Sequence, residues 1–111
     1  MRCFRSLRGR KAFTTVMGRG HRASSPTLSL FALTHRRDAA NVPEVGIVIT
    51  KKVGKAVTRN QLRRRCKAIL EGSPQSLAPK RYVLHCRPKA AALSFAELRR
   101  QLMDVLARVA S

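Results

Sequence analysis

The sequence predicts a single domain in which helices cover one β-sheet, an α+β or α/β sandwich. Its 111 residues match the usual length of one domain. With 44% hydrophobic residues, the chain has enough apolar material for one modest core. Apolar patterns with the period of a helix or of a strand follow one another without an internal repeat or a linker. We therefore expect one domain over residues 1–111.

The first third of the chain predicts one helix and one strand after a basic segment. Residues 1–10 are basic and irregular, and this segment is a candidate for disorder. A short amphipathic helix should follow, and Gly18 and Gly20 would end it. Its apolar stripe consists of Ala12, Phe13, Val16 and Met17. Residues 27–33 alternate apolar and small side chains, as a half-buried strand does, and the polar residues 34–44 predict a loop or a hairpin connection.

The middle of the chain predicts a strand followed by a basic helix. Residues 45–50 are rich in β-branched side chains and apolar on both faces, so both faces of this strand should be covered. A loop begins at Lys51 and becomes a helix, for which Thr58 is the expected N-cap. Over residues 59–70, the apolar face of this helix comprises Leu62, Cys66, Ile69 and Leu70. Gly72 should terminate the helix.

The last third predicts one more strand and one more helix. Residues 82–86 form a third strand, which Pro88 closes. In the final helix, Ser94 and Glu97 have the spacing of a capping box. The core-facing stripe of this helix comprises Phe95, Leu98, Leu102, Val105, Leu106 and Val109. The strand at 45–50, the basic helix and the third strand are a candidate βαβ crossover, for which the general preference is right-handed.

The charge balance is the strongest indication of function. The chain holds 24 Lys and Arg residues against 5 Asp and Glu, a formal net charge of +19. Because so many like charges repel one another, a polyanion that neutralises them is the expected partner. Nucleic acid is therefore the leading partner, and an acidic protein is the weaker alternative.

Several other classes of protein are disfavoured. No run of about 18 apolar residues could span a bilayer. Three cysteines without CxxC spacing support neither a disulfide framework nor a zinc ribbon, and they fit a reducing cytoplasm. Residues 1–37 lack acids, as a mitochondrial transit peptide does, but the strand pattern within them argues against a cleaved presequence. The five acidic residues are scattered, so we expect no catalytic residue and no metal site in the protein.

The basic segment offers a binding surface instead. Between Lys51 and Lys67 the chain has eight basic residues and no acidic one. Cations and backbone N–H groups at a helix N-terminus can hold phosphates, and arginine binds phosphate oxygens in a bidentate manner. A merely solvated helix face is the alternative, but such faces normally mix both signs of charge. Phe13 and Phe31 could stack on unpaired bases, although a place in the core is the simpler role for both.

The stretch from Thr50 to Arg64, TKKVGKAVTRNQLRR, resembles the signature of the bacterial ribonuclease P protein component. The family pattern has Ser/Thr-Lys-Lys, a Gly-centred turn, Ala-Val, and Arg-Asn-Arg followed by further basic residues. Phe13 and the strand ending in Phe31 also lie at family-like spacing, as do the third strand and the final helix. The resemblance extends over about residues 5–108.

The resemblance implies a fold and a role. The implied fold is an α+β sandwich with a central, mainly antiparallel four-stranded sheet and an unusual left-handed βαβ crossover, like the second domain of ribosomal protein S5. In this family, the RNA subunit performs hydrolysis with bound magnesium ions. The protein binds that RNA and the single-stranded 5′ leader of precursor tRNA, which raises substrate affinity and lowers the magnesium requirement. The resemblance thus implies a monomeric, cytoplasmic bacterial protein, in a one-to-one complex with RNA, that acts in tRNA processing.

Residue by residue, the resemblance assigns two sets of positions. The first set would face the RNA subunit and comprises Lys51, Lys52, Lys55, Arg59, Asn60, Arg63, Arg64 and Lys67. The second set would line the leader-binding cleft and comprises Phe13, Met17, Leu28 and Phe31. Three positions depart from the family pattern. Gln61 replaces the second arginine of Arg-Asn-Arg, Met17 replaces a common aromatic residue, and Glu44 stands where many members carry arginine.

Two other functions remain as alternatives. A ribosomal or other structural RNA-binding protein would share the charge and the small sheet, but its binding should be indifferent to a 5′ extension on tRNA. A nuclease acting alone should cleave RNA without any RNA subunit, and the lack of paired acids argues against it.

Overall fold

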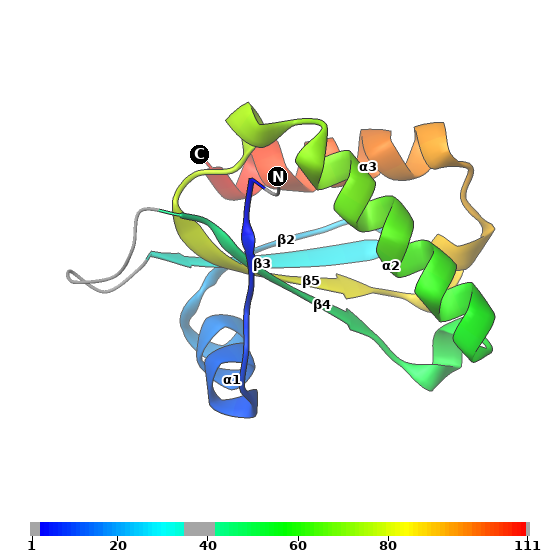
Figure 1. Cartoon of the computed structure of the whole chain (residues 1–111), viewed down its shortest axis with the longest axis horizontal. Coiled ribbons are helices and arrows are strands. Elements are labelled where there is room, and N and C mark those ends of the chain that lie inside the picture. The colour runs from blue at the N-terminus through cyan, green and yellow to red at the C-terminus, as the bar shows by residue number, and fades with distance from the viewer. Residues whose placement is uncertain (1–2, 35–41, 111) are drawn as a thin grey trace.

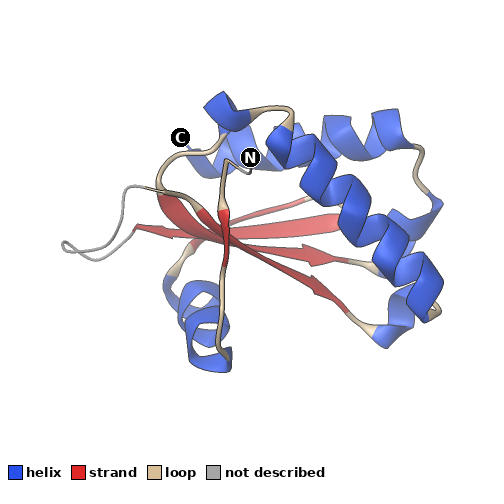
Figure 2. Cartoon of the chain, viewed as in Figure 1, coloured by secondary structure: helices blue, strands red, loops and turns tan. Residues whose placement is uncertain are grey.

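The fold is a mixed five-stranded sheet with helices on both faces, in a computed structural model that describes residues 3–34 and 42–110 (Figure 1, Figure 2). The strands are β1 (Arg5–Ser6), β2 (His21–Ser24), β3 (Leu28–Thr34), β4 (Glu44–Ile49) and β5 (Lys80–Cys86). The helices are α1 (Arg10–Arg19), α2 (Ala56–Glu71) and α3 (Phe95–Ala110), with short 3₁₀ helices η1 (Lys51–Val53), η2 (Pro74–Ser76) and η3 (Pro88–Ala92). The predicted α+β class is confirmed.

The sheet has the strand order β1-β4-β5-β3-β2. β4 pairs in parallel with β1 and β5, whereas β3 pairs antiparallel with β5 and β2. The expectation of four mainly antiparallel strands is therefore wrong, since the described residues form five strands with evenly divided pairings. β1 has only two residues and β2 reads His-Arg-Ala-Ser, so neither shows the alternating apolar pattern that predicts a strand.

β5 is the central strand of this sheet, and it separates two strands that follow one another in the chain. Because β5 lies between β3 and β4, the stretch 34–44 is not a hairpin connection, and residues 35–41 of it lie outside the described part of the chain. β4, α2 and β5 form the expected βαβ crossover, since β4 and β5 are neighbours and parallel.

Two cores lie on opposite faces of the sheet. α2 and α3 cover one face, and α1 lies against the other (Figure 1). The main core under α2 and α3 contains Leu62 and Leu102, and the smaller core under α1 is built on Val16. Side chains alternate along a strand, so Leu84 of β5 enters the main core and its neighbour Val83 enters the smaller one.

The N-terminal segment has defined backbone pairing. Phe4 and Leu7 are buried on either side of β1. The N–H of Arg5 donates to the carbonyl oxygen of Pro43 at 2.8 Å, and the N–H of Leu7 donates to that of Val45 at 3.0 Å. The irregular stretch expected over residues 1–10 thus contains an edge strand, which two isolated apolar residues do not reveal in the sequence.

Helix α2 begins earlier than predicted. Its first residue is Ala56, after Lys55, and no side chain caps it, so the expected N-cap at Thr58 is wrong. The start is set by the turn at Gly54, from which the chain enters the helix within two residues. The predicted apolar face is confirmed, because Leu62, Cys66, Ile69 and Leu70 are all buried. Gly72 is the C-cap, as expected.

The apolar stripe of α3 is confirmed except at Phe95, and one of the two hydrogen bonds of its predicted capping box is present. The N–H of Glu97 donates to Ser94 Oγ at 3.2 Å, which is one half of a capping box. The carboxylate of Glu97 accepts hydrogen bonds from Arg100 and Gln101. The other five stripe residues, Leu98, Leu102, Val105, Leu106 and Val109, are buried. Phe95 is 45% exposed and faces side chains of α2, because it stands in the first turn of α3, so its place in the core is wrong.

Candidate nucleic-acid interface

The basic loop before α2 is a tight turn held by its own backbone. Lys51 and Lys52 lie in η1 and Lys55 lies directly before α2, and all three side chains are exposed. Gly54 has a φ of 152°, which side-chain-bearing residues rarely adopt, and its carbonyl oxygen accepts a hydrogen bond from Arg59 Nε at 3.2 Å. The lysines therefore surround the N-terminus of α2, where backbone N–H groups also favour anions.

The outer surface of α2 carries the remaining residues of the predicted basic set. Asn60 and Arg64 are exposed, whereas Arg63 and Lys67 are half-buried. Arg63 Nη1 lies 3.4 Å from Asn60 Oδ1, so these side chains, one turn apart, meet on the helix surface. The structure thus places all eight predicted residues on η1, the turn after it and α2, but on different sides of the helix.

Arg63 and Lys67 border a hollow that also contains an aromatic ring from α1. This hollow has a volume of about 180 Å³ and is lined by Phe4, Ser6, Leu7, Phe13, Val45, Gly46, Ile47, Arg63 and Lys67. Phe13 packs against Gly46 of β4 so closely that a Cβ at Gly46 would stand 2.3 Å from Phe13 Cζ. Glycine therefore makes room for the ring. The hollow joins one residue of the predicted cleft to two cations of the predicted basic set.

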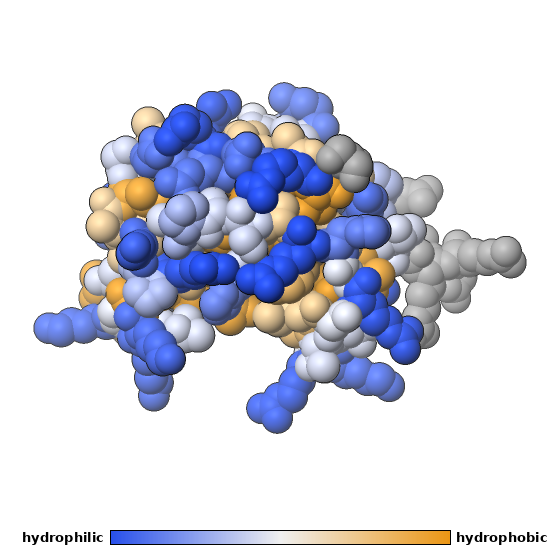
Figure 3. All heavy atoms as spheres, turned by 180° about the vertical axis from the view of Figure 1, so that it is seen from behind, coloured by the Kyte–Doolittle hydropathy of each residue, from blue (hydrophilic) through white to orange (hydrophobic). Residues whose placement is uncertain are grey.

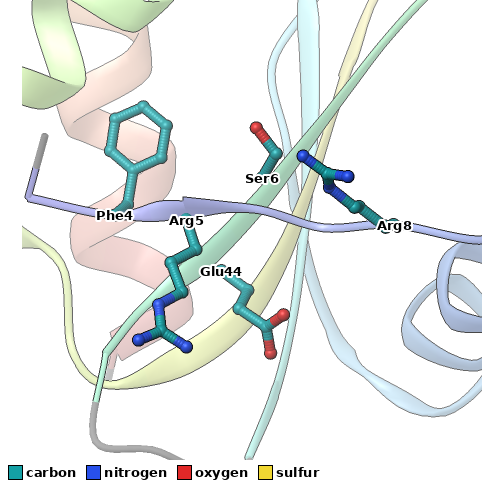
Figure 4. A pocket seen from close by; sticks show the side chains of 5 residues that line it. All are labelled: Phe4, Arg5, Ser6, Arg8 and Glu44. Atoms are coloured by element: carbon teal, nitrogen blue, oxygen red, sulfur yellow. The ribbon is translucent and has the colours of Figure 1, made fainter.

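A second hollow adjoins the first along β1 (Figure 4). It has a volume of about 470 Å³, and it is lined by Phe4, Arg5, Ser6, Arg8 and Glu44. The side chains of Arg5 and Glu44 extend to one side of β1, and those of Phe4 and Ser6 extend to the other (Figure 4). Glu44 thus contributes a carboxylate at the edge of a surface that is otherwise basic.

The sheet face on the side of α1 carries polar groups outside both predicted sets of site residues. Arg22 Cζ lies 5.6 Å from the centre of the Phe31 ring, within the range of a cation–π contact. Arg87 Nη2 donates to Ser29 Oγ at 2.9 Å. His85 lies opposite Ser29 in the register of β3 and β5. Partial burial, followed by the charges of Arg87 and Arg22, lowers the pKa of His85.

The alternation of side chains between the two faces of a strand is the sequence feature that could have predicted these groups. Arg22 is opposite Phe31 in the pairing of β2 with β3, so the two side chains share a face. His85 and Ser29 share the same face on β5 and β3. β2 has no apolar alternation that predicts a strand, so the neighbour of Phe31 could not be inferred from the sequence.

The predicted cleft set is divided between the two faces of the sheet. Phe13 and Phe31 both pack against the smaller core, and Met17 is 38% exposed on α1. Leu28 is 0% exposed and belongs to the main core under α2 and α3, so its place in the cleft is wrong. Leu28 and Phe31 stand an odd number of residues apart on β3, and such side chains point to opposite faces of a sheet.

The acidic side chains of α3 are engaged within α3. The carboxylate of Glu97 pairs with Arg100, and Asp104 Oδ2 lies 3.2 Å from Arg108 Nη1. The hydrogen bond from Arg100 lowers the pKa of Glu97. On α2, residues 59–67 include no acidic residue. Hydrophilic side chains also project over much of the opposite side of the molecule, with apolar atoms between them (Figure 3).

Groups suited to other chemistry are few in residues 3–34 and 42–110. Within these ranges, no three His, Cys, Asp or Glu side chains gather as they would around a metal ion. Cys66 and Cys86 are buried with their Sγ atoms 3.9 Å apart, and this hydrogen bond, together with burial, raises the pKa of the Cys66 thiol. Among the described helices, none has the length and apolar character needed to cross a membrane.

Sequence comparisons lead to one family. A family model for ribonuclease P matches residues 1–110. The ribonuclease P protein component of Acidothermus cellulolyticus is 36% identical over 104 residues, which cover 93% of this chain and 86% of that protein. The same component from a Nocardioides species is 39% identical over 105 residues, with 93% and 89% covered.

Solved structures share the fold. The ribonuclease P protein of Staphylococcus aureus superposes with a TM-score of 0.85 at 20% identity, covering 94% of this chain and 95% of that one. The protein from Thermotoga maritima gives a TM-score of 0.81 at 24% identity, with 94% and 96% covered. At such identities the likeness concerns the arrangement of helices and strands.

Proposed function

Because the chain belongs to the bacterial ribonuclease P protein component family, we propose that it is the protein subunit of the ribonucleoprotein that removes the 5′ leader from precursor tRNA. It binds the catalytic RNA and the single-stranded leader, and so raises substrate affinity and lowers the magnesium requirement. Its partners are one RNA subunit per protein and precursor tRNA, in the bacterial cytoplasm.

The hollow shared by Phe13, Arg63 and Lys67 carries this proposal. A single-stranded nucleotide is held by a ring that stacks on its base and by cations that bind its phosphate, and this hollow has both. An RNA leader that leaves the hollow along the sheet would next meet the ring of Phe31, over which Arg22 lies. The leader therefore binds along α1 and the sheet, while the loop and the outer face of α2 bind the RNA subunit.

The protein contributes to the reaction through its positive charge. Hydrolysis belongs to the RNA subunit and the magnesium ions that it binds. The cations on η1 and α2 offset the repulsion between the phosphates of the RNA and those of its substrate, and fewer magnesium ions are then needed to bring the two together.

Reconstitution tests the proposal. A precursor tRNA is incubated at low magnesium with a bacterial ribonuclease P RNA, with and without the protein, and with the protein alone. Cleavage that is rescued only in the mixture supports the proposal. Cleavage by the protein alone would indicate a nuclease, and no effect with RNA subunits from several bacteria would indicate a structural RNA-binding protein.

A matched pair of variants sharpens the test. Arg63→Ala with Lys67→Ala removes two charges beside Phe13, and it should reduce the preference for precursor over mature tRNA. Lys89→Ala with Arg99→Ala removes two exposed charges outside η1 and α2, and it should leave that preference unchanged. An equal effect of both pairs would mean that net charge alone governs binding.

Family membership also supports two finer expectations about the fold. The β4–α2–β5 crossover is expected to be left-handed, and the arrangement is expected to resemble the second domain of ribosomal protein S5. An experimental structure of this chain tests both expectations.

A further inference from the structure

An exposed apolar patch lies in a hollow between α2 and α3. Among the described residues, three large hydrophobic side chains are exposed, and two of them, Val57 at 80% and Phe95 at 45%, border this hollow. The hollow has a volume of about 450 Å³, and it is lined by Val57, Gln61, Arg64, Arg65, Ala68 and Phe95. It is separate from the hollow at Phe13, with which it shares no lining residue.

The polar groups of this hollow are suited to a nucleotide. Arg65 Nη1 donates to the carbonyl oxygen of Leu93 at 3.4 Å, which holds the guanidinium near the start of α3 and uses one of its five N–H donors. Arg64 is exposed on the same hollow. Gln61 adds an amide, which can both donate to and accept from the edge of a base.

We propose that this hollow binds an unpaired nucleotide of RNA, with the base stacked on Phe95, the phosphate held by Arg64 and Arg65, and the base edge bonded to Gln61. The inference rests on the proposed function, because the catalytic RNA is the molecule expected to supply the nucleotide. Stacking on an exposed ring beside arginines is how proteins hold single-stranded nucleic acid without dependence on sequence. The charge of the lining favours a phosphate over a cationic or neutral partner.

The two hollows make separable contributions. The hollow at Phe13 lies on the side of α2 that faces β1 and β4, whereas the hollow at Phe95 lies on the side that faces α3. Loss of Phe95 should therefore weaken binding of the catalytic RNA without changing the preference for precursor over mature tRNA. This pattern separates the second hollow from the leader cleft.

The test is a series of substitutions at Phe95 in the full chain, with affinity for a bacterial ribonuclease P RNA measured at fixed salt. Phe95→Ala and Phe95→Leu should each weaken binding by about 5- to 150-fold, because both lose the stacking ring. Phe95→Trp should bind as the original protein does. Leucine keeps apolar bulk, so an unchanged affinity in Phe95→Leu would overturn stacking.

Two controls complete the experiment. Gln75→Ala changes an exposed residue of η2, away from the hollow, and it should bind the RNA normally. A photoreactive phenylalanine analogue at position 95 should crosslink to an unpaired nucleotide of the RNA. Crosslinks only to base-paired RNA, or capture of an acidic protein in place of RNA, would overturn the inference.

The inference and the proposed function can fail separately. If the original protein does not stimulate the catalytic RNA, the proposed function fails, and the Phe95 series is then measured with a single-stranded RNA oligonucleotide. Equal affinities throughout that series overturn the hollow as a nucleotide site. If the protein stimulates the catalytic RNA but Phe95→Ala binds it normally, the inference alone fails.

Discussion

Phe31 takes part in both packing and the proposed binding surface. It packs with the smaller core under α1, and its ring also lies under the guanidinium of Arg22. The core holds this half-buried ring in a fixed orientation, and a base that stacks on it would take the place of the Arg22 guanidinium. Core packing and base stacking, the two roles considered from the sequence, are thus compatible at this residue.

Replacing Phe31 should therefore have a selective effect. Phe31→Ala should weaken binding of precursor tRNA to the reconstituted complex by about 5- to 150-fold, because one base loses its stacking partner. Binding of mature tRNA, which lacks the leader, should be unchanged. Phe31→Tyr keeps the ring and is the control. An equal loss for both tRNAs, or unfolding of the variant in a thermal melt, would assign Phe31 to packing alone.

Gly46 is a residue at which close packing dictates the choice of side chain. In Gly46→Ala, the new Cβ would overlap the ring of Phe13, so the ring must move, and the free energy of unfolding should fall by about 1 to 3 kcal/mol. Urea unfolding measures this change. Phe13→Leu in the same chain should recover part of the loss because the smaller side chain leaves space. A Gly46→Ala variant as stable as the original would contradict the close approach.

His85 should give the stability of the protein a specific dependence on pH. Burial and the charges of Arg87 and Arg22 hold the pKa of His85 below its ordinary value of 6.5 in the folded protein. As the pH falls through about 6.5, the unfolded chain takes up a proton that the folded chain resists, so the free energy of unfolding decreases. Urea unfolding of His85→Gln between about pH 7 and pH 5 should show a smaller decrease. Identical pH profiles would contradict this.

At the scale of the elements, α2 borders a different hollow on each side. Arg63 lies beside Phe13, whereas Arg64 lies beside Phe95. These neighbours in the sequence therefore face different hollows. The helix is positioned by its buried face, and the direction of its polar residues follows from that face.

Charge reversal on α2 should distinguish its two sides. Arg63→Glu and Arg64→Glu should each reduce the salt dependence of binding to the RNA subunit, by about 0.9 in slope for each duplex phosphate contact that is lost. Only Arg63→Glu should also reduce the preference for precursor over mature tRNA. Binding is measured over a series of salt concentrations, with Arg99→Glu as the control. Unchanged slopes would refute the assignment of this helix to RNA binding.

Periodic or apolar elements were predictable from the sequence, and very short or polar ones were not. The apolar faces of α2 and α3 and the strand β3 repeat with one period over several residues, whereas β4 and β5 are short apolar runs, and the sequence predicts each of them. β1 and β2 exist because they pair with β4 and β3, and that pairing leaves little local trace. The start of α2 depends on the turn at Gly54, which a capping preference at Thr58 does not reveal.

At the scale of the whole molecule, the high net charge should make stability depend on salt. The formal charge is +19, and mutual repulsion opposes the compact state. Raising sodium chloride from about 0.1 M to about 1 M shortens the screening length from about 10 Å to about 3 Å, so the melting temperature should rise by several degrees. A melting temperature that stays constant or falls over this range would contradict the prediction.

Both sets of candidate site residues came from the sequence, but their arrangement in space did not. Phe13 and Arg63 belong to different sets and are far apart in the chain, and the fold brings them to one hollow. The exposed position of Phe95 was not predicted, because its spacing on α3 fits the apolar stripe of the core. Which side of a helix meets another element is decided by packing between elements, and local spacing does not report it.

The position of β5 in the sheet determines when the sheet can form during synthesis of the chain. β5 is the last strand to leave the ribosome, and it is the strand that joins the β1–β4 pair to the β2–β3 pair. Until residue 86 has emerged, β3 and β4 lack the strand that lies between them, so their edges are unpaired, and unpaired strand edges make incomplete chains prone to aggregation. A premature stop before β5 should therefore yield protein that cannot assemble its sheet, even though the basic residues of α2 are complete.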